Sequence, residues 1–168
     1  MKKYALVFLL AALLIFCSCS AAENAEKGRA KGDISSYLLT VDRSFTVKAG
    51  GFEGGGRLFY SPELFRVTMT SPKGLENVEI TVENGAVSFT VGGLKTEKSL
   101  DLFPENSFLK TVYASFKDAA LNGAVTKNGD AFTVTGETPL GRYELYFDEN
   151  KTLTGIAIPE REVEISFL

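Results

Sequence analysis

The side chains that most often carry chemistry are scarce in this sequence of 168 residues. It has no histidine and no tryptophan, and its two cysteines, Cys17 and Cys19, lie together near the N-terminus. A Ser-His-Asp or Cys-His constellation cannot be assembled from this chain, because both use a histidine as the general base. Zinc sites built from histidine or cysteine are excluded after residue 19, because no such ligand follows.

Carboxylates are the remaining candidates for catalysis or metal binding. Glu79 and Glu83 could be nominated as the acid and base of a glycoside hydrolase. Both alternate with apolar residues along an expected strand, however, which is typical of a solvated polar face. The acidic turn at residues 148–150 lacks the alternating ligands of a calcium-binding loop. We therefore expect the protein not to be an enzyme and to need no cofactor or metal.

A glycine-rich stretch at residues 50–56 could be mistaken for a phosphate-binding loop. No Lys-Ser or Lys-Thr pair follows it, and the residues after it have the pattern of a strand and not of a helix. The two glycine runs in this stretch are instead expected to break the strand on either side of Phe52, as sharp bends of a curved sheet or as a hairpin tip.

Residues 1–18 have the pattern of a signal peptide. Lys2 and Lys3 precede an uncharged, mostly apolar run over residues 4–16. This run has the length of a signal-peptide core and is shorter than the roughly 20 residues that span a bilayer. An uncut N-terminal membrane anchor and a buried core helix are the alternatives, and the short run and its polar flank fit them less well.

The end of this segment resembles a bacterial lipoprotein signal. That pattern places a small residue directly before an acylated cysteine, and Ser18 precedes Cys19. We therefore predict that Cys19 is lipidated and holds the exported protein on the outer face of the cell membrane, or on an outer membrane if the cell has one. Cys17 is an alternative lipidation site, although bulky Phe16 precedes it. Ordinary signal cleavage after Ala22 is a further alternative.

Removal of the signal also changes the charge balance. Loss of Lys2 and Lys3 lowers the number of Lys and Arg residues from 18 to 16, against 21 Asp and Glu residues, so the mature chain carries a net charge of −5. This charge disfavours nucleic acid as a partner, since phosphate binding needs clustered cations. It also disfavours binding to an anionic membrane by charge alone, so the expected membrane contact is the lipid anchor.

Three segments are expected along the chain: the signal peptide, a lipidated and flexible tether at residues 19–34, and a single domain at residues 35–168. The tether is polar and rich in alanine, glycine and charge, which is typical of a linker. A short helix over residues 21–30 is the alternative. From residue 35 onward, apolar and polar residues mostly alternate, which predicts strands with one buried face.

The alternation and the turn residues between strands predict about nine or ten strands. Asn84-Gly85 is the clearest hairpin signal, because both residues tolerate the positive φ of a type I′ turn. The ten expected strands lie at residues 35–49, 57–60, 64–70, 78–82, 87–91, 124–127, 132–135, 142–148, 153–158 and 163–167, and a further short strand can run over residues 95–102.

One segment has helical spacing. Apolar residues recur three and four positions apart over residues 108–120, Asn106 or Ser107 can cap its start, and Asn122-Gly123 can end it. Short turns between sequential strands indicate an antiparallel meander. We therefore predict a mainly β fold in which an antiparallel meander forms an open half-barrel and one amphipathic helix covers it as a lid.

The domain is rich in apolar side chains for one sheet and one helix, with 11 phenylalanines after the signal. They either fill the core beneath the helix or leave an apolar cavity, in which each buried methylene of a lipid would contribute up to about 0.8 kcal/mol. The residues expected to line such a cavity are Val41, Phe45, Val47, Tyr60, Phe65, Val67, Met69, Val87, Phe89, Phe108, Val112 and Phe116.

Residues 56–72 contain a glycine followed by a strand, a proline turn, an aromatic-Arg strand and a second proline, and the next strand ends at Asn84-Gly85. This order of elements resembles the lipoprotein carrier and receptor superfamily, LolA/LolB-like with the LppX-like relatives. Pro62 and Arg66 match the motif by position. The sequence departs from the family pattern in one respect: it has no tryptophan at the place after the turn where the family often has an aromatic residue.

This resemblance implies an open half-barrel that binds acyl chains, and the predicted anchor favours a receptor-like or LppX-like role over that of a soluble carrier. Our first hypothesis is a non-enzymatic, membrane-anchored protein that binds a lipid or an acylated ligand in an apolar cavity. The alternative is a structural or interaction lipoprotein that binds an envelope protein through its sheet surface. An enzyme would need carboxylates that converge in a cleft.

Overall fold

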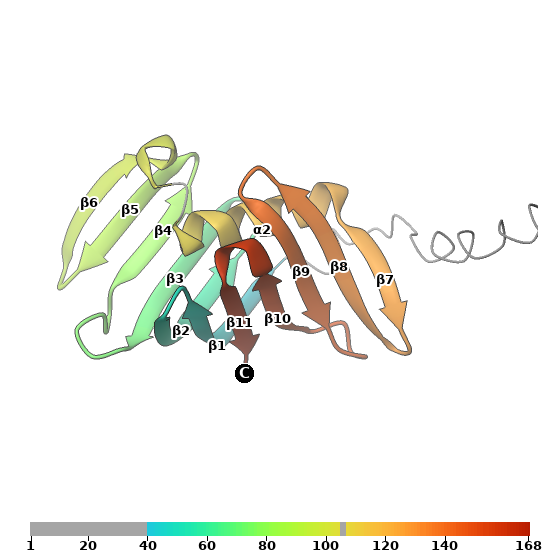
Figure 1. Cartoon of the computed structure of the whole chain (residues 1–168). Coiled ribbons are helices and arrows are strands. Elements are labelled where there is room, and N and C mark those ends of the chain that lie inside the picture. The colour runs from blue at the N-terminus through green and yellow to red at the C-terminus, as the bar shows by residue number, and fades with distance from the viewer. Residues whose placement is uncertain (1–39, 105–106) are drawn as a thin grey trace, which may run out of the picture.

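Alternating side chains build eleven antiparallel strands in the part of the chain that the computed structural model describes, residues 40–104 and 107–168 (Figure 1). The predicted signal peptide, Cys19, the tether and the first residues of the first expected strand lie outside these ranges. The elements are β1 (Val41–Ala49), β2 (Phe52–Tyr60), β3 (Leu64–Ser71), β4 (Glu79–Glu83), β5 (Ala86–Val91), β6 (Leu94–Ser99), η2 (Leu100–Leu102), α2 (Phe108–Asn122), β7 (Ala124–Asn128), β8 (Ala131–Thr138), β9 (Gly141–Phe147), β10 (Leu153–Ile158), η3 (Pro159–Arg161) and β11 (Val163–Phe167).

The strands form one sheet made of two meanders. Its order is β6-β5-β4-β3-β2-β1-β11-β10-β9-β8-β7, so pairing of β1 with β11 joins the two halves, with Val47 opposite Ile165. The segment from β6 to β7 connects the two outer strands and contains α2. Figure 1 shows this helix in the hollow of the curved sheet, between the green half and the orange-red half. The predicted open half-barrel with one covering helix is confirmed.

The glycine-rich stretch differs from its prediction in one respect. Gly50 and Gly51 form the turn between β1 and β2, as expected, but residues 54–56 do not break the strand and lie inside β2. The register with β3 shifts between Gly55 and Gly56. A Cβ atom on Gly56 would clash with the carbonyl oxygen of Thr68, so the missing side chain allows β3 to approach and the strand continues.

The segment after the β5–β6 hairpin also differs. The strand expected over residues 95–102 begins at Leu94 and ends at Ser99, and a short 3₁₀ turn follows. The hydroxyl of Ser99 accepts a hydrogen bond from the backbone N–H of Asp101, at 3.4 Å. The N–H of Leu100 donates to the carbonyl of Gly85 at 2.9 Å. These two contacts turn the chain away from the sheet edge and toward the helix.

Two local signals are confirmed. Asn84 and Gly85 have φ angles of 49° and 78°, as the type I′ hairpin requires. Ser107 caps the helix, because its hydroxyl accepts a hydrogen bond from the N–H of Lys110 at 3.4 Å. The helix runs to Asn122, two residues beyond the expected apolar spacing. No helix in the described ranges is long and apolar enough to cross a membrane.

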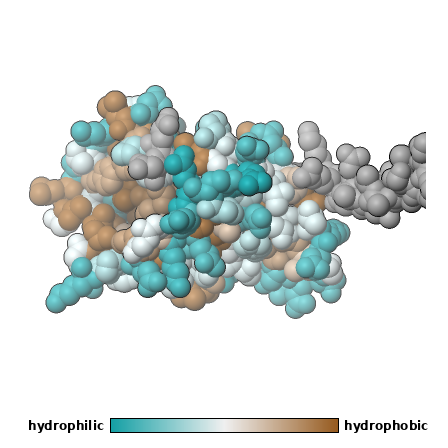
Figure 2. Space-filling view, in the orientation of Figure 1, coloured by the Kyte–Doolittle hydropathy of each residue, from teal (hydrophilic) through white to brown (hydrophobic). Residues whose placement is uncertain are grey.

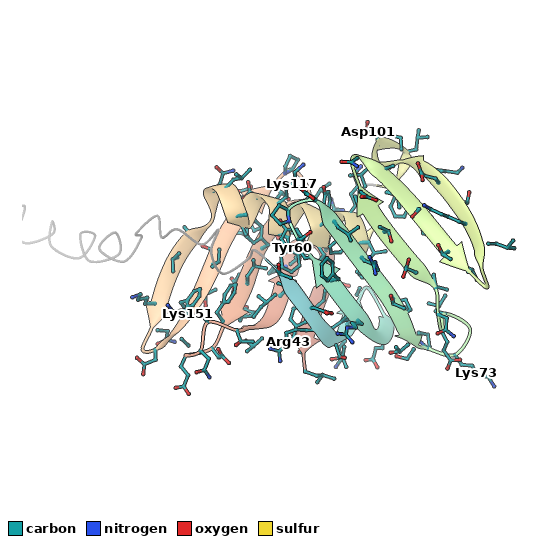
Figure 3. All side chains as sticks on the ribbon, turned by 180° about the vertical axis from the view of Figure 1, so that it is seen from behind. Arg43, Tyr60, Lys73, Asp101, Lys117 and Lys151 are labelled. Atoms are coloured by element: carbon teal, nitrogen blue, oxygen red, sulfur yellow. The ribbon has the colours of Figure 1, made fainter. Side chains whose placement is uncertain are left out.

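The core lies between the concave face of the sheet and α2. Phe116 on the helix is inaccessible to solvent and stacks on Tyr60 of β2, with ring centroids 4.6 Å apart. Thr111 and Ser115 are buried in the helix, and each hydroxyl donates to the carbonyl four residues earlier. These polar groups are therefore satisfied inside the core. Tyr60 points into this interior in the rear view (Figure 3).

Candidate functional site: an apolar groove at the start of the helix

The structure brings the predicted cavity-lining residues together on the concave side of the sheet and on α2. Phe89 and Phe108 are partly buried, and the others are buried in the core. The buried group consists of Val41, Phe45, Val47, Tyr60, Phe65, Val67, Met69, Val87, Val112 and Phe116.

The centre of the half-barrel is closed by side chains. Phe65 of β3 is inaccessible and its ring lies 5.7 Å from that of Tyr113 and 6.5 Å from that of Phe116. Together with the Tyr60–Phe116 stack, these rings fill the space beneath the middle of the helix. The space between the middle of the helix and the sheet is therefore occupied by side chains.

An apolar groove lies at the first turn of α2. It has a volume of about 440 Å³ and is formed by the β1–β2 hairpin, the β3–β4 segment, the start of the helix and the turn before β11. Met69 and Phe108 are the two predicted residues that line it. The sequence analysis missed the other lining residues, which are Ala49, Gly50, Phe52, Leu75, Val78, Ile80, Ser107, Leu109, Arg161 and Val163.

The groove has an aromatic flank, a buried floor and an open rim. The rings of Phe52 and Phe108 are stacked with centroids 6.3 Å apart. Met69 and Leu109 are buried and join the groove to the core. Leu75 is 38% exposed and lies in the β3–β4 loop, whose tip is marked by Lys73 in Figure 3. An apolar chain in the groove would therefore contact the core on one side and solvent on the other.

Of the residues that the structure describes, Arg161 is the only charged one that lines the groove. Its Nε donates a hydrogen bond to the carbonyl of Leu140 at 2.8 Å, which fixes the guanidinium at this end of the sheet. A planar guanidinium is suited to binding a carboxylate or a phosphate. The groove therefore combines apolar walls with one cationic group.

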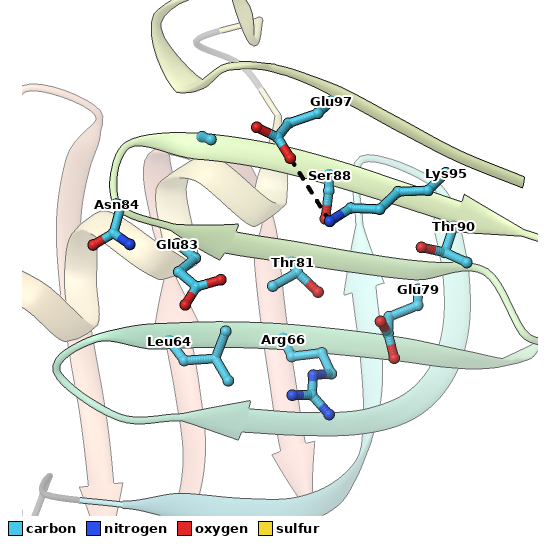
Figure 4. A pocket seen from close by; sticks show the side chains of 11 residues that line it. Leu64, Arg66, Glu79, Thr81, Glu83, Asn84, Ser88, Thr90, Lys95 and Glu97 are labelled. Atoms are coloured by element: carbon cyan, nitrogen blue, oxygen red, sulfur yellow. Dashed lines mark ion pairs between the residues drawn. The ribbon is translucent and has the colours of Figure 1, made fainter.

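The family-motif residues do not line this groove. Pro62 is exposed in the turn between β2 and β3. Arg66 lies on the outer face of the sheet, where its guanidinium carbon is 5.9 Å from the ring centroid of Phe59. It borders a polar hollow of about 510 Å³ over β3 to β6 (Figure 4). Glu79 and Glu83 border the same hollow, on the outer face as expected.

The ionisable groups that stand out have structural partners. Arg57 holds both carboxylate oxygens of Asp42, at 2.7 and 2.9 Å, and this hydrogen-bonded pairing lowers the pKa of Asp42. Burial and a 2.8 Å hydrogen bond to Asp118 raise the pKa of Tyr143 above its ordinary value. Over residues 40–104 and 107–168, no three His, Cys, Asp or Glu residues lie close enough together to hold a metal.

Apolar side chains also gather on the surface at one side of the molecule, over β5 and β6, on the left in Figure 2. The large exposed apolar residues of this region are Val91, Leu94 and Leu102, with 52%, 81% and 74% of their surface accessible. They lie outside the groove and form a second, separate apolar surface on the β6 side of the sheet.

No family model and no curated protein matches the chain. Among the solved structures that are similar to it are the following three. An uncharacterized conserved protein from Thermus thermophilus has 13% identity and a TM-score of 0.49, with 81% of each chain covered. A complex of the CwlD amidase with the GerS lipoprotein from Clostridioides difficile has 13% identity and a TM-score of 0.41, covering 73% of this chain and 77% of that chain.

The third structure is the LolA superfamily protein NE2245 from Nitrosomonas europaea, with 10% identity, a TM-score of 0.35, and coverage of 75% of this chain and 69% of that chain. One of the structures to which this chain is similar is therefore a protein of the superfamily that the sequence resembles. Because all three TM-scores are below 0.5, the function is argued from the groove itself.

Proposed function

We propose that this protein is a membrane-anchored lipoprotein that binds one acyl chain in the groove at the start of α2. The observation that carries the proposal is an apolar groove of about 440 Å³ with a single cationic residue in its described lining. Ligand pockets for small molecules have volumes of roughly 300–1,000 Å³ and are mostly apolar with few polar groups. The groove fits this description, and its buried floor joins it to the core.

The walls support an extended hydrocarbon as the ligand. Phe52 offers apolar surface from the start of β2, and Leu75 and Val78 offer it from the β3–β4 segment, and none of them carries a hydrogen-bonding side chain. Each methylene that moves from water into such surroundings contributes up to about 0.8 kcal/mol. Affinity is therefore expected to rise with chain length until the groove is full.

The cation supports an anionic head group. Arg161 can form charge-assisted hydrogen bonds with a carboxylate or a phosphate, which are about twice as strong as neutral ones. The ligand class with both features is a fatty acid or a phospholipid.

The predicted anchor places the groove within reach of such ligands. If Cys19 is lipidated, the 20 residues between it and Thr40 span at most about 70 Å when fully extended. This length allows the domain to approach the membrane surface while it stays attached. The protein would then act beside the membrane that supplies the lipid.

Binding is tested with residues 21–168 and the fluorescent fatty acid cis-parinaric acid. The wild-type protein should bind it with a fluorescence increase, and native mass spectrometry should show one added molecule. Val78→Trp fills the groove from the half-buried β3–β4 segment and should weaken binding at least tenfold. Val91→Trp, an equal change at the exposed β5–β6 hairpin, should not.

The proposal fails if the wild-type protein binds no fatty acid. It also fails if Val78→Trp, shown by circular dichroism to be folded, binds as well as Val91→Trp. Binding that both variants keep would place the chain somewhere other than the groove.

An interaction lipoprotein is the second candidate, and a specific observation favours it. The outer strand β6 is exposed along its whole length, and its first residue, Leu94, and the last residue of β5, Val91, are exposed apolar residues. An exposed sheet edge of this kind can accept a strand from another protein. This role would use the β6 edge, which does not line the groove, and could coexist with lipid binding.

A further inference from the structure

Strand β6 is an open edge of the sheet. It stands first in the strand order and, within the described part of the chain, pairs with β5 only, in register from Ala86 opposite Ser99 to Val91 opposite Leu94. All six of its residues are exposed. The N–H and C=O groups on its outer side face no other described strand, and such groups form a template for pairing with another chain.

Strand β6 carries both positive and negative side chains, and a lysine and a glutamate lie two residues apart on the same face. Lys95 and Glu97 lie on the outer face, opposite Thr90 and Ser88 of β5, as Figure 4 shows. Their charged atoms are 3.7 Å apart, and both side chains are about 60% exposed. Ion pairs with this exposure contribute little to stability, so each partner can exchange its contact at small cost.

We propose that two copies of this chain associate through antiparallel pairing of β6 with β6, centred on Thr96. In this register, Lys95 lies opposite Glu97 of the second copy, and Glu97 lies opposite Lys95 of the second copy. The two-fold symmetry makes both contacts at once, and opposite charges across a strand pair are stabilising. The occupant of this edge is therefore a second copy.

The charge pattern selects this register over its neighbours. A shift of one residue in either direction removes both Lys95–Glu97 contacts and turns the two concave faces to opposite sides. A shift of two residues places Glu97 opposite Glu97, or Lys95 opposite Lys95. Like charges directly opposite each other destabilise a strand pair.

The same register covers apolar surface. Leu94, which is 81% exposed, lies opposite Lys98 of the second copy, whose aliphatic stem can pack on it. Thr96 lies opposite its own equivalent, a pair that is favourable in antiparallel sheets. The other outer strand, β7, has Lys127 as its one charged residue, so its self-pairing gains no such complementarity.

The test measures the oligomeric state of the full-length protein, purified from membranes in detergent, by sedimentation velocity over a range of concentrations. The wild type should form a dimer. Lys95→Glu and Glu97→Lys should each raise the dimer dissociation constant at least tenfold, because each places like charges opposite each other at two positions. The double variant Lys95→Glu/Glu97→Lys should dimerise like the wild type.

Mixing the two single variants gives a further test, whose result would not change if Lys95 and Glu97 only stabilised the fold of one chain. Equal amounts of the two single variants should form a heterodimer, because glutamates on one β6 then face lysines on the other. Lys48→Glu, which breaks the exposed Lys48–Glu53 pair (3.9 Å) on another part of the sheet, is the matched control and should leave the dimer unchanged. The proposal is overturned by a wild type that stays monomeric, or by a dimer that the single variants do not weaken or the double variant does not restore.

Discussion

The two halves of the sheet differ in how completely the helix covers them. In the half made of β7 to β11, Val134, Leu145 and Ile156 are inaccessible to solvent, and Tyr143 donates a hydrogen bond to Asp118 on the helix. In the half made of β1 to β6, the core ends at β5, β6 is fully exposed, and most of the groove lies between β1, β2, β3 and the start of α2.

This contrast suggests that one half of the sheet mainly stabilises the fold and that the other half carries the surfaces that bind ligands or partners. The β7–β11 half and the helix pack as a closed unit around inaccessible side chains. The β1–β6 half leaves an apolar groove at one end and an open strand at its edge. We therefore expect substitutions at the inaccessible positions of the first half to change the free energy of unfolding, and substitutions in the groove and on the exposed β6 edge of the second half to change binding.

A matched pair of leucines tests this contrast most strongly. Leu145→Ala removes an inaccessible side chain of β9 and should lower the free energy of unfolding by about 2–5 kcal/mol. Leu94→Ala, at an 81% exposed position on β6, should change it by less than about 0.5 kcal/mol. Urea denaturation in dilute solution measures both. Equal losses would show that the β6 side is as firmly packed as the β9 side.

A tyrosine in the closed half has the next largest effect. Tyr143→Phe removes the hydrogen bond to the Asp118 carboxylate and should cost about 1–3 kcal/mol at neutral pH. The phenol is buried, so its pKa in the folded protein lies above that in the unfolded chain. The folded state therefore keeps a proton that the unfolded state loses above about pH 10, and stability falls as the pH rises beyond that point.

The wild-type protein should accordingly lose stability between about pH 10 and pH 11 more steeply than Tyr143→Phe does. Tyr146→Phe is the matched control on the same strand, because Tyr146 is 38% exposed and donates to Glu144 at 2.7 Å. This hydrogen bond raises the pKa of Tyr146 to about 12, but solvent screens the exposed phenol, so Tyr146→Phe should alter the alkaline limb less. An alkaline limb that Tyr143→Phe leaves unchanged would contradict the buried position of this phenol.

Substitution of Arg161, the charged residue of the groove, should have a smaller effect, and this effect should be on ligand affinity. Arg161→Gln should weaken the affinity for a fatty acid by about tenfold, the loss of one charge-assisted hydrogen bond. The fatty alcohol of the same length has no carboxylate, so its affinity should stay constant. Titration with both ligands distinguishes the two cases. Equal weakening of acid and alcohol would mean that Arg161 shapes the groove and does not bind the head group.

The smallest effect is expected on the outer face. Asp42 is exposed and paired with Arg57, and its pKa is lowered, so the pair stabilises the fold above about pH 4 and loses this effect as the pH falls. Asp42→Asn should flatten the acid limb of stability slightly, and high salt should remove the difference from the wild type. An effect as large as that of Tyr143→Phe would contradict this ranking.

Local signals in the sequence predicted much of the fold. Alternation placed the strands, Asn84-Gly85 placed a hairpin, and Ser107 placed the start of the helix, because each of these depends on nearby residues only. The glycines at residues 54–56 were misjudged, since the approach of Thr68 from the next strand decides whether the chain breaks there. That contact is not visible from local sequence.

The groove could be predicted only in part. Met69 and Phe108 were found because their apolar faces follow the strand and helix periods. Val78 was expected to begin a strand but lies just before β4, and Val163 comes from the last strand, which reaches the groove because β11 pairs with β1. Periodicity also cannot distinguish a residue that lines a groove from one that fills the core, so most of the predicted lining proved to be buried.

Photolabelling with a diazirine-bearing fatty acid tests the central claim, binding of an acyl chain in the groove, most directly. Residues 21–168 are irradiated with the probe, digested and analysed by mass spectrometry. The account predicts label on the peptides that hold Phe52, Leu75, Val78 and Phe108, and its loss when unlabelled fatty acid competes. Label confined to the outer face around Arg66 and Thr81, or label that competition does not reduce, would contradict it.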